Sequence, residues 1–439
     1  MRKISRRQLS LLFGDICIII FSFYVALIIR TGERFSTFHH AVLVCSLAVA
    51  YIASFYIFEL YNFRRVSRST NFLTSMGGAF GLVYIFAILI FYIFPYKLGR
   101  GVFFISWALT GLIVLAWRLA YVSLFKFSQS RRNVMILGDK TTTEPLIAAL
   151  ENDPEFRLAA VLEIENVKEE LEDKFVEKNE IDDIVVSVNG RDLSELERAL
   201  VNCRMKGINC YTIEAFYERL LEKLPVLMLS DRWFLTSGGF DKLGNRFYKS
   251  IKRAVDFTFA GLILLITLPL STIVALLILL TSKGPILFTQ ERLGAGKKPF
   301  RIIKFRTMVH NAEVNGPQWA QNNDRRVTKL GKILRKTRID EIPQLINVLK
   351  GDMSLIGPRP EREYFVDQLS SKIPFYSLRF FVKPGITGWA QVNFRYGSDE
   401  KDALEKLRYE LYYIKNQSLF LDFRITMKTI RVILFGMGT

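Results

Sequence analysis

The segment Arg335–Lys350 reads RKTRIDEIPQLINVLK and places two adjacent carboxylates, Asp340 and Glu341, after a run of basic residues. Pro343 fits only the first turn of a helix, because proline lacks a backbone N–H and its ring blocks the turn before it. We therefore expect a helix that runs through Leu349, with the acidic pair at its start. A helix N-terminus and neighbouring arginines both favour the charged form of a carboxyl group, so the segment predicts two ionised side chains.

Further cations flank this pair in the sequence. Lys304 and Arg306 alternate with Phe305 in a strand-like run, so both can point from one face, and phosphate contact by one of them competes with simple surface charge. Downstream, Arg359 stands between two prolines and presents a planar guanidinium suited to phosphate. An ionised aspartate can act as a nucleophile, and an ionised neighbour can hold Mg²⁺ through oxygen. Each signal alone has a common structural explanation, a solvated helix cap or a stiff turn.

The spacing of the whole set resembles the catalytic domain of bacterial polyprenol-phosphate phosphoglycosyl transferases of the monotopic type, which initiate surface-glycan and exopolysaccharide assembly. The resemblance covers about residues 247–439, and the full layout is similar to the long, multi-domain branch of that family. The matching residues are Phe288 to Gln290, Lys304 to Met308, Arg335, Asp340, Glu341, Asn347 to Ser354, Gly357 to Pro360, and Lys383 to Asn393.

This resemblance implies a reaction and a set of roles. A phosphosugar would pass from a nucleotide diphosphate sugar, most readily a UDP-sugar, to polyprenol (undecaprenyl) phosphate, with release of a nucleoside monophosphate. Asp340 would be the nucleophile that carries the phosphosugar covalently, and Glu341 would hold Mg²⁺ as the cofactor. The substrate phosphates would be bound by four cationic side chains: Arg335, Arg359, Lys304 and Arg306.

Composition limits the kinds of partner. The 439 residues are 50% hydrophobic, which suggests that part of the chain lies in lipid, and the formal net charge of +18 calls for a polyanionic partner. No nucleic-acid-binding motif is present, and the basic residues cluster beside apolar runs, which favours lipid and phosphate over nucleic acid. The four cysteines lack metal-ligand spacing, so we expect free thiols in a reducing compartment.

The first 127 residues predict a four-helix transmembrane domain. Each apolar run is close to the ~20 residues that a bilayer core requires, and the first is too long, and followed by too many others, for a cleaved signal peptide. Basic residues at the N-terminus, in the second loop (Arg64, Arg65, Arg68) and after the fourth run place these ends in the cytoplasm. The four runs are Leu9 to Ile29, Phe38 to Leu60, Ser75 to Phe94, and Val102 to Phe125.

Residues 128–240 predict a Rossmann-like α/β domain. Short apolar strands at 134–137, 184–188 and 208–213 alternate with helical segments, which indicates a small parallel sheet. Only Gly138 follows the first strand, and Asp139, Lys140 and three threonines come next, so the glycines of a dinucleotide-binding turn are missing. Nucleotide binding and a regulatory or packing role both stay open for this domain.

A fifth apolar run, 255–281, decides on which side of the membrane Asp340 lies. It is long enough to span, but basic residues flank it on both sides, and Pro269 near its middle can break a helix into two arms. We therefore expect a re-entrant hairpin that enters and leaves by one leaflet, with a proline-kinked span as the alternative. The resemblance adds weight, because a broken membrane helix defines that family.

The predicted fold class is membrane α plus α/β: four N-terminal transmembrane helices, a Rossmann-like middle domain, and a C-terminal α/β catalytic domain with a re-entrant membrane helix. The expected location is the bacterial inner membrane, with the catalytic domain on the cytoplasmic face. A membrane-bound oxidoreductase, suggested by the Tyr248 and Lys252 spacing, and a non-catalytic scaffold are the other classes considered. The oligomeric state is left open, with a homodimer among the options.

Overall fold

The computed structural model describes residues 6–32, 38–58, 60–61, 69–93, 100–126, 131–151, 153, 155–163, 179–187, 194–309, 326–394 and 399–435. The chain divides into two compact units, Met1–Thr212 and Ile213–Thr439. The basic residues Arg64, Arg65 and Arg68, on which the predicted orientation rests in part, lie outside the described residues.

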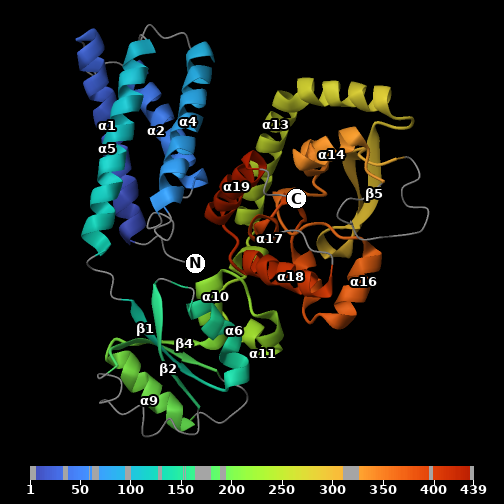
Figure 1. Cartoon of the computed structure of the whole chain (residues 1–439). Helices are drawn as coiled ribbons and strands as arrows, with labels where there is room; N and C mark the ends of the chain where they lie inside the picture. The colour runs from blue at the N-terminus through green and yellow to red at the C-terminus, as the bar shows by residue number, and fades with distance from the viewer. Residues whose placement is uncertain are drawn as a thin grey trace. The chain divides into compact units, whose positions relative to one another are not determined.

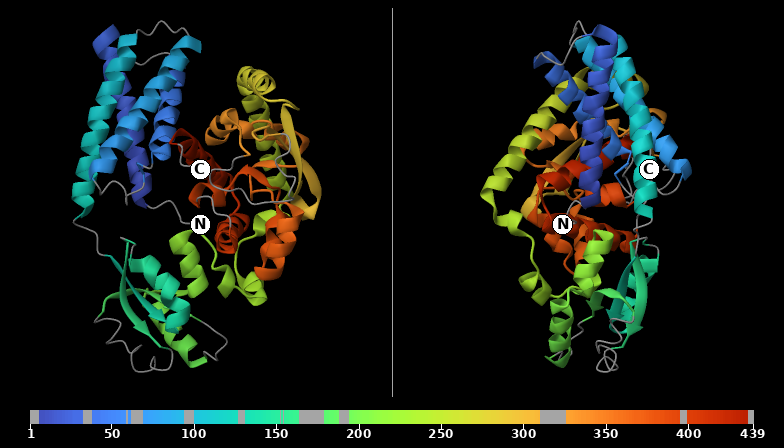
Figure 2. Two further views of the ribbon diagram at one scale, coloured as in Figure 1. Left: turned by 45° about the vertical axis from the view of Figure 1, so that its right-hand side comes forward. Right: turned by 90° about the vertical axis from the view of Figure 1, so that its left-hand side faces the viewer.

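Apolar helices form the first part of the first unit. They are α1 (Arg6–Thr31), α2 (Phe38–Ile57), α4 (Ser69–Ile93) and α5 (Arg100–Lys126). These helices run side by side, as Figures 1 and 2 show, and α1 packs along α5. Asp15 of α1 and Arg118 of α5 form a buried ion pair at this contact, with 2.5 Å between Oδ2 and Nη2.

Two of the four expected N-terminal spans are long and apolar enough to cross a membrane. Within the described residues these are Leu9–Thr31 and Gly101–Tyr121, and the third such helix of the chain is Arg246–Thr281. The helices at the other two expected positions have shorter apolar segments, Ala41–Ile57 and Phe72–Ile88, among the residues whose side chains are described. The prediction of four long spans is therefore wrong as a count for the described chain, although helices occupy all four positions.

A parallel sheet completes the first unit. Its strands are β1 (Arg132–Leu137), β2 (Phe156–Leu162), β3 (Ile181–Val186) and β4 (Asn209–Thr212), with α6 (Lys140–Glu151) and α9 (Ser194–Met205) between them. The order is β2-β1-β3-β4 and every pairing is parallel, which confirms the predicted sheet. The sequence does not single out β2, because this edge strand is only partly buried and its residues alternate irregularly.

One face of this sheet packs against α9. Met135, Leu137, Ile184 and Val186 form a hydrophobic cluster with Cys203 of that helix. The residues that alternate with them in β1, such as Ile136, are equally buried. Burial on both faces is typical of a parallel sheet, and it explains why these strands read as continuous apolar runs.

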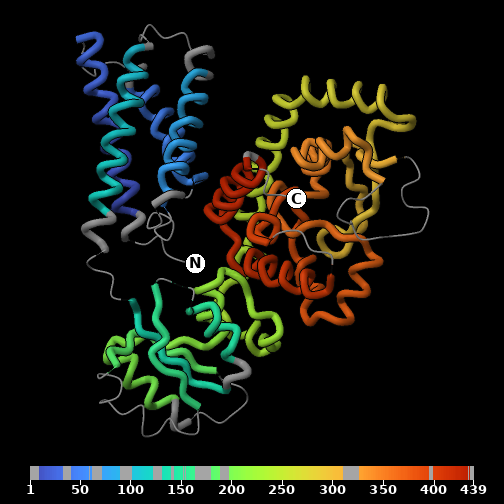
Figure 3. Tube along the Cα trace, viewed as in Figure 1, coloured from blue at the N-terminus to red at the C-terminus, as the bar shows by residue number. Residues whose placement is uncertain are grey.

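The second unit mixes helices with two small sheets. Strands β5 and β6 pair antiparallel, and β7 and β8 pair parallel. Figure 3 follows the backbone through this unit from green to red. Its elements are α10 (Ile213–Leu221), η2 (Val226–Met228), α11 (Asp231–Thr236), α12 (Asp241–Gly244), α13 (Arg246–Thr281), β5 (Leu287–Leu293), η3 (Ala295–Lys297), β6 (Pro299–Phe305), α14 (Lys329–Lys336), η4 (Ile339–Glu341), α15 (Gln344–Lys350), β7 (Ser354–Ile356), α16 (Glu363–Lys372), η5 (Tyr376–Phe381), β8 (Gly385–Thr387), α17 (Trp389–Asn393), α18 (Glu400–Lys415) and α19 (Leu419–Leu434).

Residues 213–240, which the sequence assigns to the Rossmann-like domain, pack into the core of the second unit. Leu224 and Val226 are fully buried in one hydrophobic cluster with Leu407 and Leu411 of α18. The backbone N–H of Leu224 donates to the carbonyl of Arg408, at 3.0 Å. This segment therefore supports the unit that contains the acidic pair.

Helix α13 bends sharply into two arms, as Figure 1 shows, and Pro269 lies inside it. A straight helix of its 36 residues would be roughly 54 Å long. Instead, Ala260 of the first arm shares a hydrophobic cluster with Ile302, and Val274 of the second arm shares one with Phe305. Ile302 and Phe305 are close together on β6, so both arms of α13 pack against the same strand.

Candidate functional site

The acidic pair lies on a short connection between two helices. α14 ends at Lys336, Arg338 takes a left-handed conformation with φ 57°, and Asp340 and Glu341 follow in the 3₁₀ turn η4. Pro343 is the N-cap residue of α15. The pair was expected in the first turn of the helix, and it instead occupies a separate turn directly before it, because the chain must reverse at Arg338 after α14.

Three cationic side chains converge on one oxygen of Glu341. Lys304 Nζ lies 3.2 Å, Arg359 Nη2 3.4 Å and Arg338 Nη1 3.6 Å from Oε1. Burial disfavours the charged form of Glu341, but Lys304, Arg359 and Arg338 outweigh it and lower the pKa to about 2. Glu341 is therefore ionised at neutral pH, as the sequence predicts.

Asp340 behaves differently from its neighbour. It is 7% exposed, and its Oδ1 atom is buried with no hydrogen-bond partner among the described residues. Burial and the charge of Glu341 raise the pKa of Asp340 to about 6, against the opposing effect of Lys304 and the nearby arginines. The sequence predicts that its surroundings favour ionisation, and burial, which a sequence does not reveal, reverses the direction of the shift.

The cations predicted to bind phosphate divide into two groups. Arg335 donates from Nε to Thr307 Oγ1 at 2.9 Å, and its charge acts on Asp340. Together with Lys304 and Arg359 it belongs to the surroundings of the pair. Arg306 does not, because its guanidinium donates to the backbone carbonyls of Ser282 and Lys283, at 2.9 and 3.1 Å.

Close backbone packing holds the Pro358–Pro360 loop beside this pair. The carbonyl of Pro358 accepts from the N–H of Gly385 at 2.8 Å, and the N–H of Gly357 donates to Thr387 at 2.9 Å. A Cβ atom on Gly357 would lie 2.3 Å from the carbonyl oxygen of Lys383, so only glycine fits there. The two chain segments therefore cross at a distance that no larger residue permits.

Comparison with known proteins assigns the second unit to a family. The model of the bacterial sugar transferase family matches residues 247–436. A UDP-glucose:undecaprenyl-phosphate glucose-1-phosphate transferase of Caulobacter vibrioides is 44% identical over 183 residues, which are 41% of this chain and 68% of that protein. This chain belongs to the bacterial sugar transferase family.

Two other members of the bacterial sugar transferase family match longer segments. A UDP-N-acetylgalactosamine-undecaprenyl-phosphate N-acetylgalactosaminephosphotransferase of Aeromonas hydrophila is 46% identical over 258 residues, 58% of this chain. A UDP-glucose:undecaprenyl-phosphate glucose-1-phosphate transferase of Escherichia coli (strain K12) is 40% identical over 226 residues, 50% of this chain. The matches span 60% and 46% of these two relatives.

In this sugar transferase, two residues without a predicted role also shape the site. Arg338 contacts Glu341 directly, and its spacing three residues before Glu341 is the signal that could have indicated this. Asn347 is 1% exposed, accepts from the N–H of Ile303 at 3.1 Å and donates to the carbonyl of Arg301 at 2.8 Å. Asn347 joins α15 to β6 and so brings Lys304 next to the acidic pair. The sequence gives no signal for this contact, because it forms only in the folded chain.

The carboxylate pair fits a magnesium ion that also binds substrate. Among the described residues there is no group of three or more His, Cys, Asp or Glu side chains that could hold a metal by themselves. Mg²⁺, however, is commonly held by one or two carboxylates together with substrate phosphates. The three cations lie close to Oε1 of Glu341, and Oδ1 of Asp340 has no hydrogen-bond partner among the described residues, so Asp340 has an oxygen atom for such an ion.

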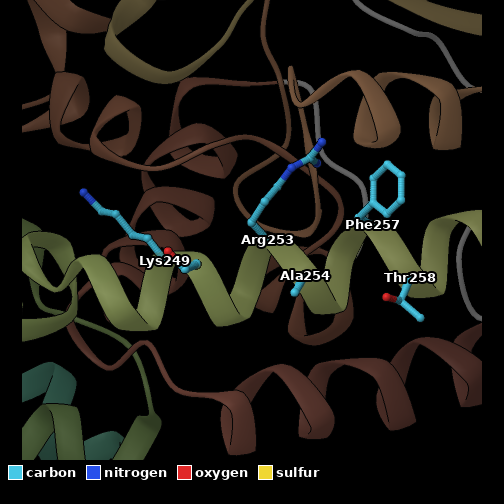
Figure 4. Close-up of a pocket in the computed structure, with 6 residues that line it drawn as sticks. Lys249, Arg253, Ala254, Phe257 and Thr258 are labelled. Atoms are coloured by element: carbon cyan, nitrogen blue, oxygen red, sulfur yellow. The ribbon is translucent and has the colours of Figure 1, made fainter.

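An open hollow of about 540 Å³ lies along the first arm of α13, away from the predicted site residues. Figure 4 shows Lys249, Arg253 and Phe257 on one side of the helix at this hollow. Arg253 donates to the carbonyls of Val348 and Leu349, at 2.5 and 2.7 Å, and so caps the C-terminal end of α15. The first arm is thereby fixed to the helix that follows the acidic pair.

Proposed function

We propose that this bacterial sugar transferase moves a sugar 1-phosphate from a UDP-sugar to undecaprenyl phosphate and releases uridine monophosphate. The names of the relatives support this pair of substrates. The observation that carries the proposal is Asp340, a buried carboxylate with one oxygen that has no hydrogen-bond partner among the described residues, beside a Glu341 that three cations hold ionised. A carboxylate among cations suits attack on a negatively charged phosphorus centre.

The reaction proceeds in two balanced steps. An oxygen of Asp340 attacks the sugar-bearing phosphorus, a new P–O bond forms, the bond from that phosphorus to the bridging oxygen breaks, and the nucleoside monophosphate leaves. An oxygen of polyprenol phosphate then attacks the same phosphorus, the bond to Asp340 breaks, and polyprenol diphosphate sugar is released. Each step exchanges one P–O bond for another, so no oxidant is needed and both substrates use one small site in turn.

The cations around the pair bind and orient the phosphates. Arg359, Arg335 and Lys304 stabilise negative charge on the phosphoryl group that is transferred, as positive groups do in other phosphoryl transfers. For Arg306 we assign an anchoring role instead, because its guanidinium is already engaged by the backbone after α13. Glu341 and the substrate diphosphate would hold Mg²⁺, which when bound neutralises charge on the diphosphate.

The two arms of α13 support a re-entrant arrangement in the membrane. Both arms pack against β6, which is compatible with a helix that enters and leaves by one leaflet and has both ends on the same side of the lipid. Basic residues flank its apolar run, residues 255–281, on both sides, with Lys249 before and Lys283 after, which favours the cytoplasmic face of the bacterial inner membrane. The long apolar helices α1 and α5 would span this membrane, making the protein multi-pass.

A panel of nucleotide sugars tests the proposal directly. Membranes containing the protein are incubated with polyprenol phosphate and each nucleotide sugar, and release of nucleoside monophosphate is measured. We expect release from one or a few UDP-sugars, dependent on both the chain and divalent metal. No release from any donor would sink the reaction class and leave an oxidoreductase or a scaffold, and release of nucleoside diphosphate would mean transfer of the sugar without its phosphate.

A further inference from the structure

A buried ion pair lies beneath the loop that carries Arg359. Arg379 of η5 and Glu410 of α18 are 5% and 4% exposed, with 2.8 Å between Nη2 and Oε1. Nη1 of Arg379 also donates to the hydroxyl of Tyr376, at 2.5 Å. Removing two charges from water costs several kcal/mol per ion, and apolar residues of similar size often replace such pairs without loss of stability. A contribution to stability is therefore a weak explanation for the buried charges of Arg379 and Glu410.

The pair holds the backbone of Arg359 on both sides. Nη2 of Arg379 donates to the carbonyl oxygen of Arg359 at 2.8 Å. The backbone N–H of Arg359 donates to the carboxylate of Glu410, a contact that lowers the pKa of Glu410 against the larger effect of burial. A single ion pair thus satisfies both backbone polar groups of one residue, which apolar side chains could not do.

Neighbouring contacts restrict the loop further. Pro358 and Pro360 fix the backbone on either side of Arg359, because the proline ring locks φ. The carbonyl of Glu361 accepts from the N–H of Leu293 at 3.0 Å. The side chain of Arg359 leaves this fixed backbone and reaches Glu341 Oε1 at 3.4 Å. Its direction toward the acidic pair therefore depends on the peptide groups that Arg379 and Glu410 hold.

We propose that Arg379 and Glu410 are positioning residues, which clamp the backbone of Arg359 so that its guanidinium meets the phosphoryl group at Asp340. This positioning role rests on the proposed function, in which Arg359 binds the phosphate of the substrate. Neither residue touches substrate. A displacement of about 1 Å at a reacting centre can cost about 100-fold in rate, so a clamp of this kind has a measurable effect.

The test replaces the pair by apolar residues of similar volume. The double variant Arg379→Met/Glu410→Leu should keep a cooperative thermal transition at a lower midpoint, because packed apolar residues can replace the ion pair but leave the backbone groups of Arg359 without these partners. Its rate of monophosphate release should fall about 10- to 100-fold. Combined with Arg359→Ala, it should add less than a twofold further loss, because both changes remove the same interaction.

The matched control is a partly buried ion pair of the same unit. Lys415 and Glu218 lie 2.6 Å apart with side chains 10% and 12% exposed, and neither belongs to the site. Lys415→Met/Glu218→Leu should leave the rate within about twofold of the native chain. Any loss of rate in this control variant should multiply with the loss caused by Arg359→Ala, as expected for independent positions.

Hydrogen exchange gives a readout independent of activity. Within 357–361 only Gly357, Arg359 and Glu361 carry a backbone N–H, because the other two residues are prolines. In Arg379→Met/Glu410→Leu the peptide that covers this segment should exchange faster than in the native chain, and the control should match the native chain.

Two results would overturn the positioning role. One is unchanged exchange in this peptide, which means that no clamp exists. The other is faster exchange in the double variant together with a native rate of monophosphate release. Faster exchange together with a loss of rate that multiplies with the loss caused by Arg359→Ala would count in the same way. If the native chain released no monophosphate from any donor, the proposed function would fail, and with it the role in catalysis, whereas exchange would still show whether the clamp exists.

Discussion

Nη2 of Arg359 lies 3.4 Å from Oε1 of Glu341, although 18 residues separate the two positions in the chain. Lys304 reaches the same oxygen from a position 37 residues away. Strand β6, the turn η4 and the loop between two prolines thus supply one charge cluster. Because each element is fixed by its own packing, the cluster exists before any substrate arrives.

Replacing the nucleophile should stop the reaction. Asp340→Asn keeps the size of the side chain but cannot attack phosphorus as an anion, so we expect at least a ~1,000-fold lower rate and no labelled protein after incubation with a nucleotide sugar labelled in the sugar. Asp367→Asn, on an exposed carboxylate of α16, is the control and should be native-like. Substantial retained activity in Asp340→Asn would refute the assignment.

The pH dependence should follow the ionisation of Asp340. Its pKa is raised to about 6, and the ionised form is the nucleophile, so kcat/KM should fall tenfold per pH unit below about 6 and level off above about 7. Glu341→Gln removes a charge that raises this pKa, and the midpoint should move to lower pH. A profile that is flat between pH 5 and 7 in the native chain would contradict the proposal.

The same shift has a consequence for stability. A carboxyl group with a pKa of about 6 when folded and 3.8 as its ordinary value destabilises the fold at pH values above 6, and this cost vanishes below the ordinary value. Asp340→Asn should therefore raise stability at pH 7 by up to about 3 kcal/mol, with the gain lost as the pH falls from 6 to below 4. Thermal melts of both forms between pH 4 and 8 measure it.

Glu341 should control the response to metal. With Glu341→Gln the Mg²⁺ concentration for half-maximal rate should rise at least about tenfold, because one anionic ligand is lost. Glu363→Gln, an exposed change in the first turn of α16, serves as the reference. An unchanged metal titration in Glu341→Gln would count against its role.

Lys304 of β6 and Arg306, which directly follows this strand, should differ in role: Lys304 acts on the reaction, and Arg306 anchors the backbone. Lys304→Met removes a charge beside Glu341 and should lower the rate more than tenfold with little change in the melting temperature. Arg306→Gln removes hydrogen bonds to the carbonyls of Ser282 and Lys283 and should lower the melting temperature by several degrees with a smaller effect on kcat. The reverse pattern would mean that Arg306, and not Lys304, binds phosphate.

The topology of α13 can be read by cysteine labelling. In a chain without its four native cysteines, Ser250→Cys lies near the start of α13, before the apolar run, and Lys283→Cys lies just after the end of the helix. A reagent that does not cross membranes should label both only after the cytoplasmic side is opened. Labelling of one site from each side would establish a simple span and place Asp340 outside the cytoplasm.

The order of elements could be predicted to a large extent from local patterns. Apolar runs indicate the N-terminal helices, and buried strands between helices indicate the parallel sheet, because both patterns depend on residues close in sequence. The edge strand β2 escapes this reasoning, since its burial is partial. The sequence also overestimates the number of long membrane spans, because a run of apolar residues does not fix where a helix begins or how much of that helix is apolar.

The order of residues alone indicates which positions carry charge, among them the acidic pair and the arginine between two prolines, and it places an uncharged proline inside the apolar run of α13. Only the tertiary structure decided which cations meet the pair, that Arg306 binds backbone instead, and that burial raises the pKa of Asp340 to about 6. The physical reason is that charge is a property of each residue, whereas desolvation and Coulomb energy depend on distances between segments that the chain brings together only when folded.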